Sequence, residues 1–196
     1  MTTVRKFSQE LQAWAKGEGP KTLNSLSTDF SKDTFAIIIL LLMAVPALPA
    51  PTGGLTHVFE IITMLLSLEL IAGRTTIWLP KRWRNKSLAG FARGKLMAKL
   101  IGVIRWFERF ARLRGEKFMG STYTVPFIGL CTFVFTLAAF VAPPFSGLDT
   151  LPSLGVVIIA LSLIFSDVVL LLLGIAVGAV GIGLIFALGS VVFKLF

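Results

Sequence analysis

Apolar and polar positions alternate along this chain in long blocks. Two apolar arms, 35–48 and 58–72, flank a stretch rich in proline and glycine, and the same order returns with arms at 126–141 and 154–165. A final block, 168–193, holds 26 residues without a charged side chain. These blocks predict an all-α integral membrane protein with two broken helical hairpins followed by one long helix.

The arms are short for a membrane crossing. At about 1.5 Å per helical residue, the first two cover roughly 21 to 23 Å, less than the roughly 30 Å of a hydrocarbon core. Either loop residues lengthen the arms into thin or tilted full spans, or each pair forms a re-entrant hairpin that enters and leaves on one face. The final block is about 39 Å long as a helix, and we expect it to span.

Proline and glycine break both pairs of arms at matching positions. A shift of 93 residues aligns Pro51 with Pro144 and Gly54 with Gly147. Internal repeats of short, broken apolar segments are typical of transporter-like folds, whose sites lie where the two halves meet. Two unrelated hairpins would give the same order of arm, break and arm, so both interpretations stand.

A strongly basic segment separates the two hairpins. Residues 74–117 hold 13 of the 19 basic residues and two acidic ones, a local balance of +11. Apolar positions recur there at three- and four-residue steps: Leu96, Leu100, Val103, Phe107 and Phe110. This periodicity predicts an amphipathic helix at an anionic membrane surface, where the segment could also bind a phosphate head group.

The basic residues also predict the orientation of the chain. Five precede the first hairpin, neither break contains one, and only Lys194 follows the final block. The ends of both hairpins and the N-terminus are therefore expected to be cytoplasmic and the C-terminus to lie outside. The predicted segments are a cytoplasmic N-terminal segment (1–34), a first membrane hairpin (35–73), a basic cytoplasmic or interfacial segment (74–125), a second hairpin (126–167) and a C-terminal transmembrane helix (168–196).

Composition narrows the possible classes of protein. Hydrophobic residues make up 55% of the chain, charged residues 15%, and the mean hydropathy is +0.85, which is typical of a membrane protein. The net charge of +9 would suit nucleic acid, but the hydropathy argues against such a partner. Cys131 and His57 are each the single residue of their type, which excludes an internal disulfide and zinc clusters. No nucleophile elbow or phosphate-binding loop occurs, so we expect neither an enzyme nor a bound metal or cofactor.

Two acidic residues lie within the second arm. Glu60 and Glu69 are nine positions apart, and a carboxylate in a membrane segment is costly unless it has a function or a partner. Proton coupling or substrate binding is one interpretation. The other is structural: Glu69 reaches the interface or bonds a facing polar group such as Ser162, its counterpart in the repeat.

A second polar group lies beside the breaks. His57 and Glu60 are three residues apart, on one face of a helix, and Asp149 follows the other break. These side chains could form a polar cluster. Helix capping explains Thr56, Asp149 and Ser153 equally well, because their oxygens can accept the first amide protons of the following arm.

Arg74 and Asp167 occupy equivalent ends of the two repeats, after Gly73 and Ser166. If the halves pack about a pseudo-two-fold axis, the two opposite charges would meet and pair. Alternatively, Arg74 marks the cytoplasmic boundary and Asp167 caps the final helix at its positive end.

A specific motif follows the first hairpin. Gly73 and Arg74 precede Trp-Leu-Pro at 78–80 and two basic residues, which gives the pattern G-R-x-x-x-W-L-P-[KR]-[KR]. Together with the broken hairpins, the basic middle and the second break, P-P-F-S-G-L-D-T-L-P-S, the chain resembles the exopolysaccharide synthesis ExoD family from about Leu23 onward. The resemblance implies a bacterial inner-membrane protein needed for exopolysaccharide production, and it brings no established catalytic residues.

Two functions from different classes remain open. One is a small transporter or lipid-carrier translocase, for which a polyprenyl-phosphate carrier is a candidate partner. The other is an accessory or regulatory subunit that docks a synthase through its basic face and its glycine-rich helix. Gly174 and Gly178 stand in G-x-x-x-G register, which permits close packing within the chain or in a homodimer.

Overall fold

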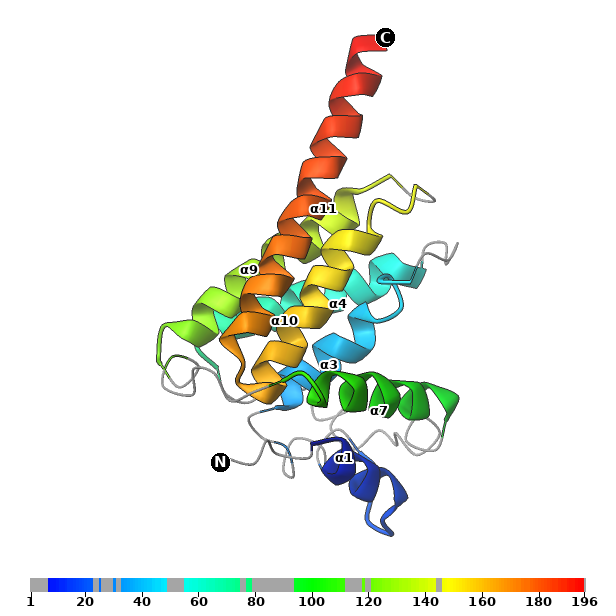
Figure 1. Cartoon of the computed structure of the whole chain (residues 1–196), viewed down its shortest axis with the longest axis vertical. Coiled ribbons are helices and arrows are strands. Elements are labelled where there is room, and N and C mark those ends of the chain that lie inside the picture. Colours follow the sequence, from blue (N-terminus) through cyan, green and yellow to red (C-terminus); the bar gives the residue numbers. More distant parts are fainter. Residues whose placement is uncertain are drawn as a thin grey trace.

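The computed structural model describes residues 7–22, 25, 30, 33–48, 55–74, 77–78, 94–111, 118, 121–143 and 146–195. Within these ranges the fold has seven helices and no strand (Figure 1). The helices are α1 (Phe7–Lys16), α3 (Thr34–Met43), α4 (Leu55–Ile71), α7 (Lys95–Glu108), α9 (Thr124–Val141), α10 (Thr150–Phe165) and α11 (Val168–Leu195). The predicted all-α architecture is confirmed. Three of the predicted break residues, Pro51, Gly54 and Pro144, lie outside the described residues.

Helix α10 lies at the centre of the bundle. It packs against α3, α9 and α11, and almost every side chain from Val156 to Ile164 is buried. Its sequence is apolar all round, and a helix of that kind is stable only when covered on every side. Gly147 precedes it with φ at +69°, a left-handed backbone that glycine adopts without the steric penalty of a Cβ.

The two hairpins pack in a crossed manner. Helix α4, the second arm of the first hairpin, lies along α9, the first arm of the second; α10 lies along α3. If the two hairpins exchange places, α4 takes the position of α10 and α9 takes that of α3. The pair of α4 and α9 then becomes the pair of α10 and α3. The crossed packing is therefore what a pseudo-two-fold relation between the hairpins would produce.

The second arms also end in the same backbone motif, 93 residues apart. Gly73 and Ser166 have left-handed φ angles of 70° and 51°, and their N–H groups donate to the carbonyl three residues earlier, at 2.9 and 3.4 Å. The N–H groups of Arg74 and Asp167 donate to the carbonyl five residues earlier, at 3.0 and 3.1 Å. This pair of bonds defines the Schellman motif, so both arms stop in the same way. The shared geometry supports the internal repeat.

Helices α10 and α11 approach each other along a glycine seam. A Cβ added to Gly155 would lie 2.7 Å from the Cα of Gly178, and one added to Gly174 would lie 2.9 Å from the Gly155 carbonyl oxygen. The Phe135 ring of α9 covers Gly178, at 2.6 Å from its added Cβ. The predicted G-x-x-x-G pair thus serves close packing within the chain.

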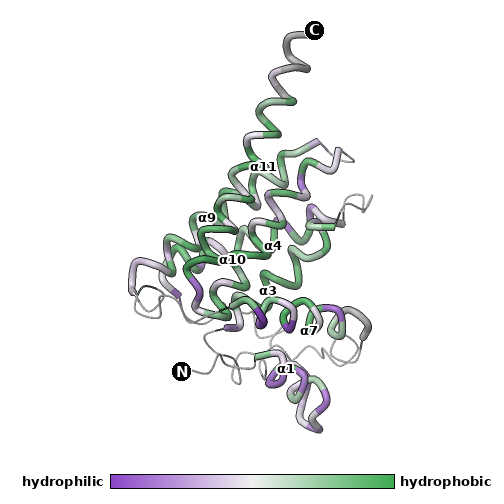
Figure 2. The backbone as a smooth tube through the Cα atoms, in the orientation of Figure 1, coloured by the Kyte–Doolittle hydropathy of each residue, from purple (hydrophilic) through white to green (hydrophobic). Residues whose placement is uncertain are grey.

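Large apolar side chains cover the outside of the bundle. On α4 and α9 they recur at three- and four-residue steps: Val58, Ile61, Leu65 and Leu68, and then Phe127, Leu130, Val134, Leu137 and Val141. Helices α9 and α11 are long and apolar enough to cross a membrane, while α3 and α10 are shorter apolar helices. Figure 2 shows the resulting contrast between the apolar bundle and the more polar α1 and α7. Exposed apolar faces of this extent are typical of surfaces that something other than water covers.

The amphipathic helix predicted between the hairpins is present as α7. Its apolar residues do not form one membrane-facing stripe, however. Leu100 and Ile104 are buried, whereas Val103 and Trp106, and Phe110 just after the helix, are exposed. The difference arises because the amphipathic α1 folds back along α7 and covers one face of it.

Candidate functional site

His57 and Glu60 meet at the first turns of α4. Nδ1 of His57 lies 2.8 Å from Oε2 of Glu60, the side chain of Glu60 is fully buried, and that of His57 is 34% exposed. The His57 ring also contacts the ring of Phe140 edge-on, with centroids 5.1 Å apart. A surface-accessible imidazole is thus joined directly to a buried carboxyl group.

The second oxygen of Glu60 is buried without a hydrogen-bond partner. The hydroxyl groups of Thr63, Thr136 and Ser153 share this property among the residues that the structure describes. Buried polar atoms nearly always have partners, and leaving one unsatisfied costs roughly 1 to 3 kcal/mol. Groups of such atoms commonly mark sites that water or a ligand occupies.

Helices α4 and α9 run antiparallel with a register fixed at both ends. At one end His57 contacts Phe140; at the other, a Cβ on Gly129 would lie 2.7 Å from the Ile71 nitrogen. Steps of three and four residues from these contacts place Thr63 opposite Thr136 and Ser67 opposite Thr132. All four hydroxyl residues are buried. We call them the hydroxyl seam; it continues from Glu60 along the interface of the two helices.

The hydroxyl seam was not predicted, although the sequence held a signal for it. Thr63 and Ser67 are four residues apart on one arm, and Thr132 and Thr136 are four apart on another. Equal spacing on two apolar arms is what an antiparallel contact between them requires. The sequence alone could not show that these two arms, which belong to different hairpins, are neighbours.

Asp149 joins the same end of the bundle. Its charge acts electrostatically on Glu60, so the structure brings the three predicted polar residues, His57, Glu60 and Asp149, into one neighbourhood. The capping interpretation is wrong for two of its three residues: Asp149 makes no side-chain cap bond to α10, and the Ser153 hydroxyl is unpartnered. Thr56 is buried at the start of α4.

Glu69 lies at the opposite end of α4 and has a different partner from the one expected. Its Oε2 accepts the backbone N–H of Trp78 at 2.8 Å. The Ser162 hydroxyl donates instead to the Ile159 carbonyl, one turn back in α10, at 2.7 Å. Glu69 therefore does bond a polar group, but the suggested partner Ser162 is wrong, because the Schellman turn at Gly73 reverses the chain and presents the Trp78 amide to the carboxylate.

Of the two interpretations of Arg74 and Asp167, the ion pair is absent and the helix cap is present. Arg74 is exposed, whereas Asp167 is buried and its Oδ1 accepts the Val169 N–H at 2.9 Å, which caps the N-terminus of α11. The two residues do occupy equivalent backbone positions. They do not meet, because the crossed packing places α4 against α9 and α10 against α3 rather than α4 against α10.

These features define a class of protein: a small helical bundle with apolar outer faces and polar groups within its helix interfaces. The ExoD family, described as exopolysaccharide synthesis, matches the chain over residues 7–187. The chain therefore belongs to the ExoD family, and this membership implies a part in exopolysaccharide synthesis.

A curated relative shares this sequence pattern more distantly. It is an uncharacterized protein of Synechocystis sp., 26% identical over 165 residues, which cover 79% of this chain and 74% of the relative. No solved structure matches the chain.

Proposed function

We propose that this protein is a multi-pass protein of the bacterial inner membrane that acts in exopolysaccharide synthesis as a small transporter or lipid-carrier translocase. Its outward apolar stripes on α4 and α9 and the two helices able to cross a membrane support a bilayer location. The distribution of basic residues supports a cytoplasmic N-terminus and an outer C-terminus.

The observation that carries the proposal is the buried carboxyl group of Glu60. One of its oxygens meets the partly exposed His57, and the other is unpartnered beside the hydroxyl seam. Ionisable groups inside membrane segments are costly and are characteristic of ion and proton pathways. In this mechanism His57 exchanges a proton with the aqueous side and passes it to Glu60. The neutral carboxyl group then donates its proton in a hydrogen bond that the carboxylate cannot make.

The length of α11 supports a position for this site within the membrane. The added Cβ of Gly181 would lie 2.5 Å from Pro152 in the first turn of α10, so α10 begins level with residue 181 of α11. At about 1.5 Å per residue, Val168 lies about 20 Å from that level and the helix continues for roughly another 20 Å beyond it. Figure 1 shows this part of α11 projecting past the other helices. If α11 spans a hydrocarbon core of about 30 Å, the broken ends of the hairpins lie inside it. This geometry favours re-entrant hairpins, with His57 and Glu60 reached through a water-filled cavity.

Transport by the purified protein in liposomes tests the proposal. The probe is a fluorescent polyprenyl phosphate, and its movement between leaflets is followed with a pH gradient in each direction. We expect movement above that of protein-free liposomes, dependence on the gradient, and loss of that dependence in Glu60→Gln. Glu18→Gln, an exposed carboxyl group outside the helices, is the matched control. Wild-type activity equal to the protein-free rate in both gradients would refute transport of this carrier.

The alternative is an accessory subunit of a synthase complex. It is favoured by the exposed side chains of Val103 and Trp106 on α7 and of Phe110 just beyond its end, beside the exposed Lys99 and Arg109. Aromatic residues and arginine are enriched in protein interfaces. Under this alternative, charge reversal at Lys99 and Arg109 lowers polysaccharide output in cells, whereas Glu60→Gln leaves it unchanged.

A further inference from the structure

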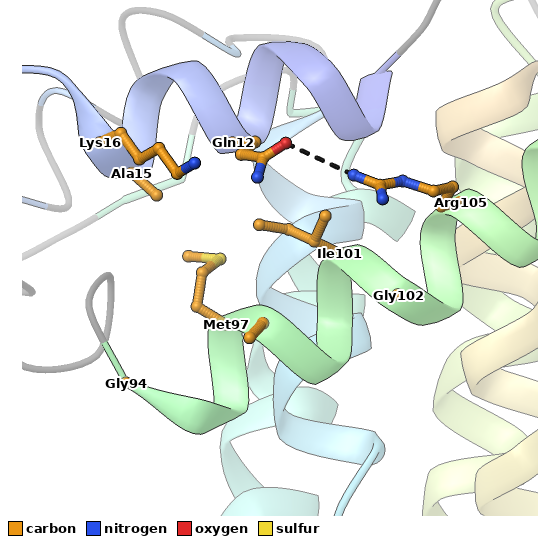
Figure 3. Close-up of a pocket in the computed structure, with 9 residues that line it drawn as sticks. Gln12, Ala15, Lys16, Gly94, Met97, Ile101, Gly102 and Arg105 are labelled. Atoms are coloured by element: carbon orange, nitrogen blue, oxygen red, sulfur yellow. Dashed lines mark hydrogen bonds between the residues drawn. The ribbon is translucent and has the colours of Figure 1, made fainter.

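Helices α1 and α7 line a half-open cavity of about 550 Å³ at the foot of the bundle, and Figure 3 shows its lining. The lining residues are Gln12, Ala15, Lys16, Gly94, Met97, Ala98, Ile101, Gly102 and Arg105. The two helices are antiparallel, because Ser8 at the start of α1 meets Glu108 at the end of α7. The cavity is thus a feature of a paired helix unit and lies apart from His57 and Glu60.

The cavity forms because the two helices are in close contact at one end, whereas at the other end small residues line them and leave space between them. The Ser8 amide and hydroxyl both donate to the Glu108 carboxylate, each at 2.7 Å, and Phe7 and Leu11 are fully buried. Toward the other end, alanine and glycine line both helices. A Cβ on Gly102 would have no atom within 4 Å, so there is open space above the α7 backbone.

Charge and apolarity are arranged on opposite sides of this space. Met97 and Ile101 are buried and form an apolar floor on α7. Lys16 and Arg105 supply two cationic groups at the rim, and none of the lining residues that the structure describes is acidic. Arg105 makes a 3.4 Å hydrogen bond to the Gln12 oxygen and keeps further N–H donors on its guanidinium fork (Figure 3).

We propose that this cavity binds the headgroup phosphate of an anionic membrane phospholipid. Lys16 and Arg105 would bind the phosphate through charge-assisted hydrogen bonds, and the first carbons of the lipid would lie against the apolar part of the lining, to which Ala98 contributes. This apolar surface favours a lipid over free phosphate, because a small hydrated anion leaves it uncovered. This inference shares the membrane location with the proposed function but does not require transport.

Three sets of variants separate the binding of the phosphate by the cations from the packing of the lipid carbons in the cavity. Lys16→Met with Arg105→Gln removes the cations. Gly102→Phe keeps them and fills the cavity, and the open space at its Cβ position allows the change without a backbone clash. The matched control is Lys99→Met with Arg109→Gln, which removes the same charge from exposed positions of the same segment outside the cavity.

The assay is native mass spectrometry of the full chain in detergent, titrated with phosphatidylglycerol, phosphatidylcholine or inorganic phosphate. We expect one tightly retained phosphatidylglycerol on the wild type and on the control, and about tenfold weaker retention on both cavity variants, as expected for a lost charged hydrogen bond or a blocked site. Glu60→Gln should retain the lipid, so a failure of transport and a failure of lipid binding remain distinguishable.

Three results would overturn the inference. Equal retention of phosphatidylglycerol and phosphatidylcholine by the wild type would show that the site does not recognise the charge of the headgroup. Inorganic phosphate binding as tightly as phosphatidylglycerol would assign the site to a soluble anion. Unchanged lipid retention by Gly102→Phe would place the bound lipid outside the cavity, and this variant decides the matter alone if the double charge variant fails to fold.

Discussion

Replacement of Gly155 by alanine tests the close packing of α10 and α11 directly. The new Cβ would lie 2.7 Å from both Cα and N of Gly178 and 2.8 Å from the Gly174 carbonyl oxygen. These neighbours are backbone atoms of a long helix, which no rotamer change can move. The two helices must separate by several tenths of an ångström or more to reach ordinary contact distances.

Two opposing effects set the change in the free energy of unfolding. Alanine in place of glycine favours a helix interior by about 0.5 to 1 kcal/mol. Overpacking of a tight interior costs about 1 to 3 kcal/mol. Because α10 is the central helix, its displacement also disturbs α3 and α9. We therefore expect a net loss of about 1 to 2 kcal/mol for Gly155→Ala.

Gly183 provides the matched control on α11. A Cβ at that position has no atom within 4 Å, so Gly183→Ala should keep the helix-propensity gain without a steric cost. Gly178→Ala should be intermediate, because its Cβ would meet the Phe135 ring, a side chain that can shift. From most to least stable, we expect the order Gly183→Ala, wild type, Gly178→Ala and Gly155→Ala.

The measurement is thermal unfolding of the purified variants in the same detergent. For a chain of this size a change of 1 kcal/mol moves the Tm by about 2 to 4 °C, so Gly155→Ala should unfold several degrees below Gly183→Ala. If the two variants have the same Tm, the helices do not approach as closely as the structure has them, and the argument from the glycine seam is wrong.

Three further predictions concern single positions. Asp167→Ala should cost about 1 kcal/mol of stability through loss of the α11 cap, and Asp167→Asn should restore most of it, as measured by Tm; equal losses in both would exclude the cap. Glu69→Gln should leave the fold and polysaccharide output unchanged across external pH, because the amide oxygen still accepts the Trp78 N–H; a pH-dependent defect would instead show that Glu69 titrates in function. In a Cys131→Ser background, Ser146→Cys should react slowly with an impermeant maleimide added to intact cells if the hairpin is re-entrant, and fast labelling would support full spans.

Much of the fold could be predicted from local pattern. The apolar blocks predicted α3, α4, α9, α10 and α11, and the breaks between them predicted the hairpins, because long apolar runs and proline or glycine act on the chain locally. The basic amphipathic α7 was likewise visible as a periodicity. The packing of α1 against α7 could not be predicted from local pattern, because the Ser8–Glu108 bond joins residues 100 positions apart.

In the candidate site, too, contacts between residues close in the sequence could be predicted, whereas contacts set by the tertiary structure could not. His57 and Glu60 could be paired from the sequence, since three residues along a helix bring two side chains onto one face. The partner of Glu69 and the separation of Arg74 from Asp167 could not, because both depend on where the chain turns and on which arms become neighbours. Residues in equivalent repeat positions have equivalent backbones, but they meet only if they lie near the symmetry axis.

The sequence by itself determined the helices, their breaks and the matched ends of the second arms, because hydrophobic periodicity and backbone stereochemistry act within a few residues. The tertiary structure decided that the hairpins cross, that α10 takes the centre, and that the hydroxyl seam faces inward beside Glu60. Apolar surfaces attract one another without direction, so many pairings of apolar arms are compatible with one pattern. The choice among them came from shape, above all from the close approach that Gly129, Gly155 and Gly178 permit.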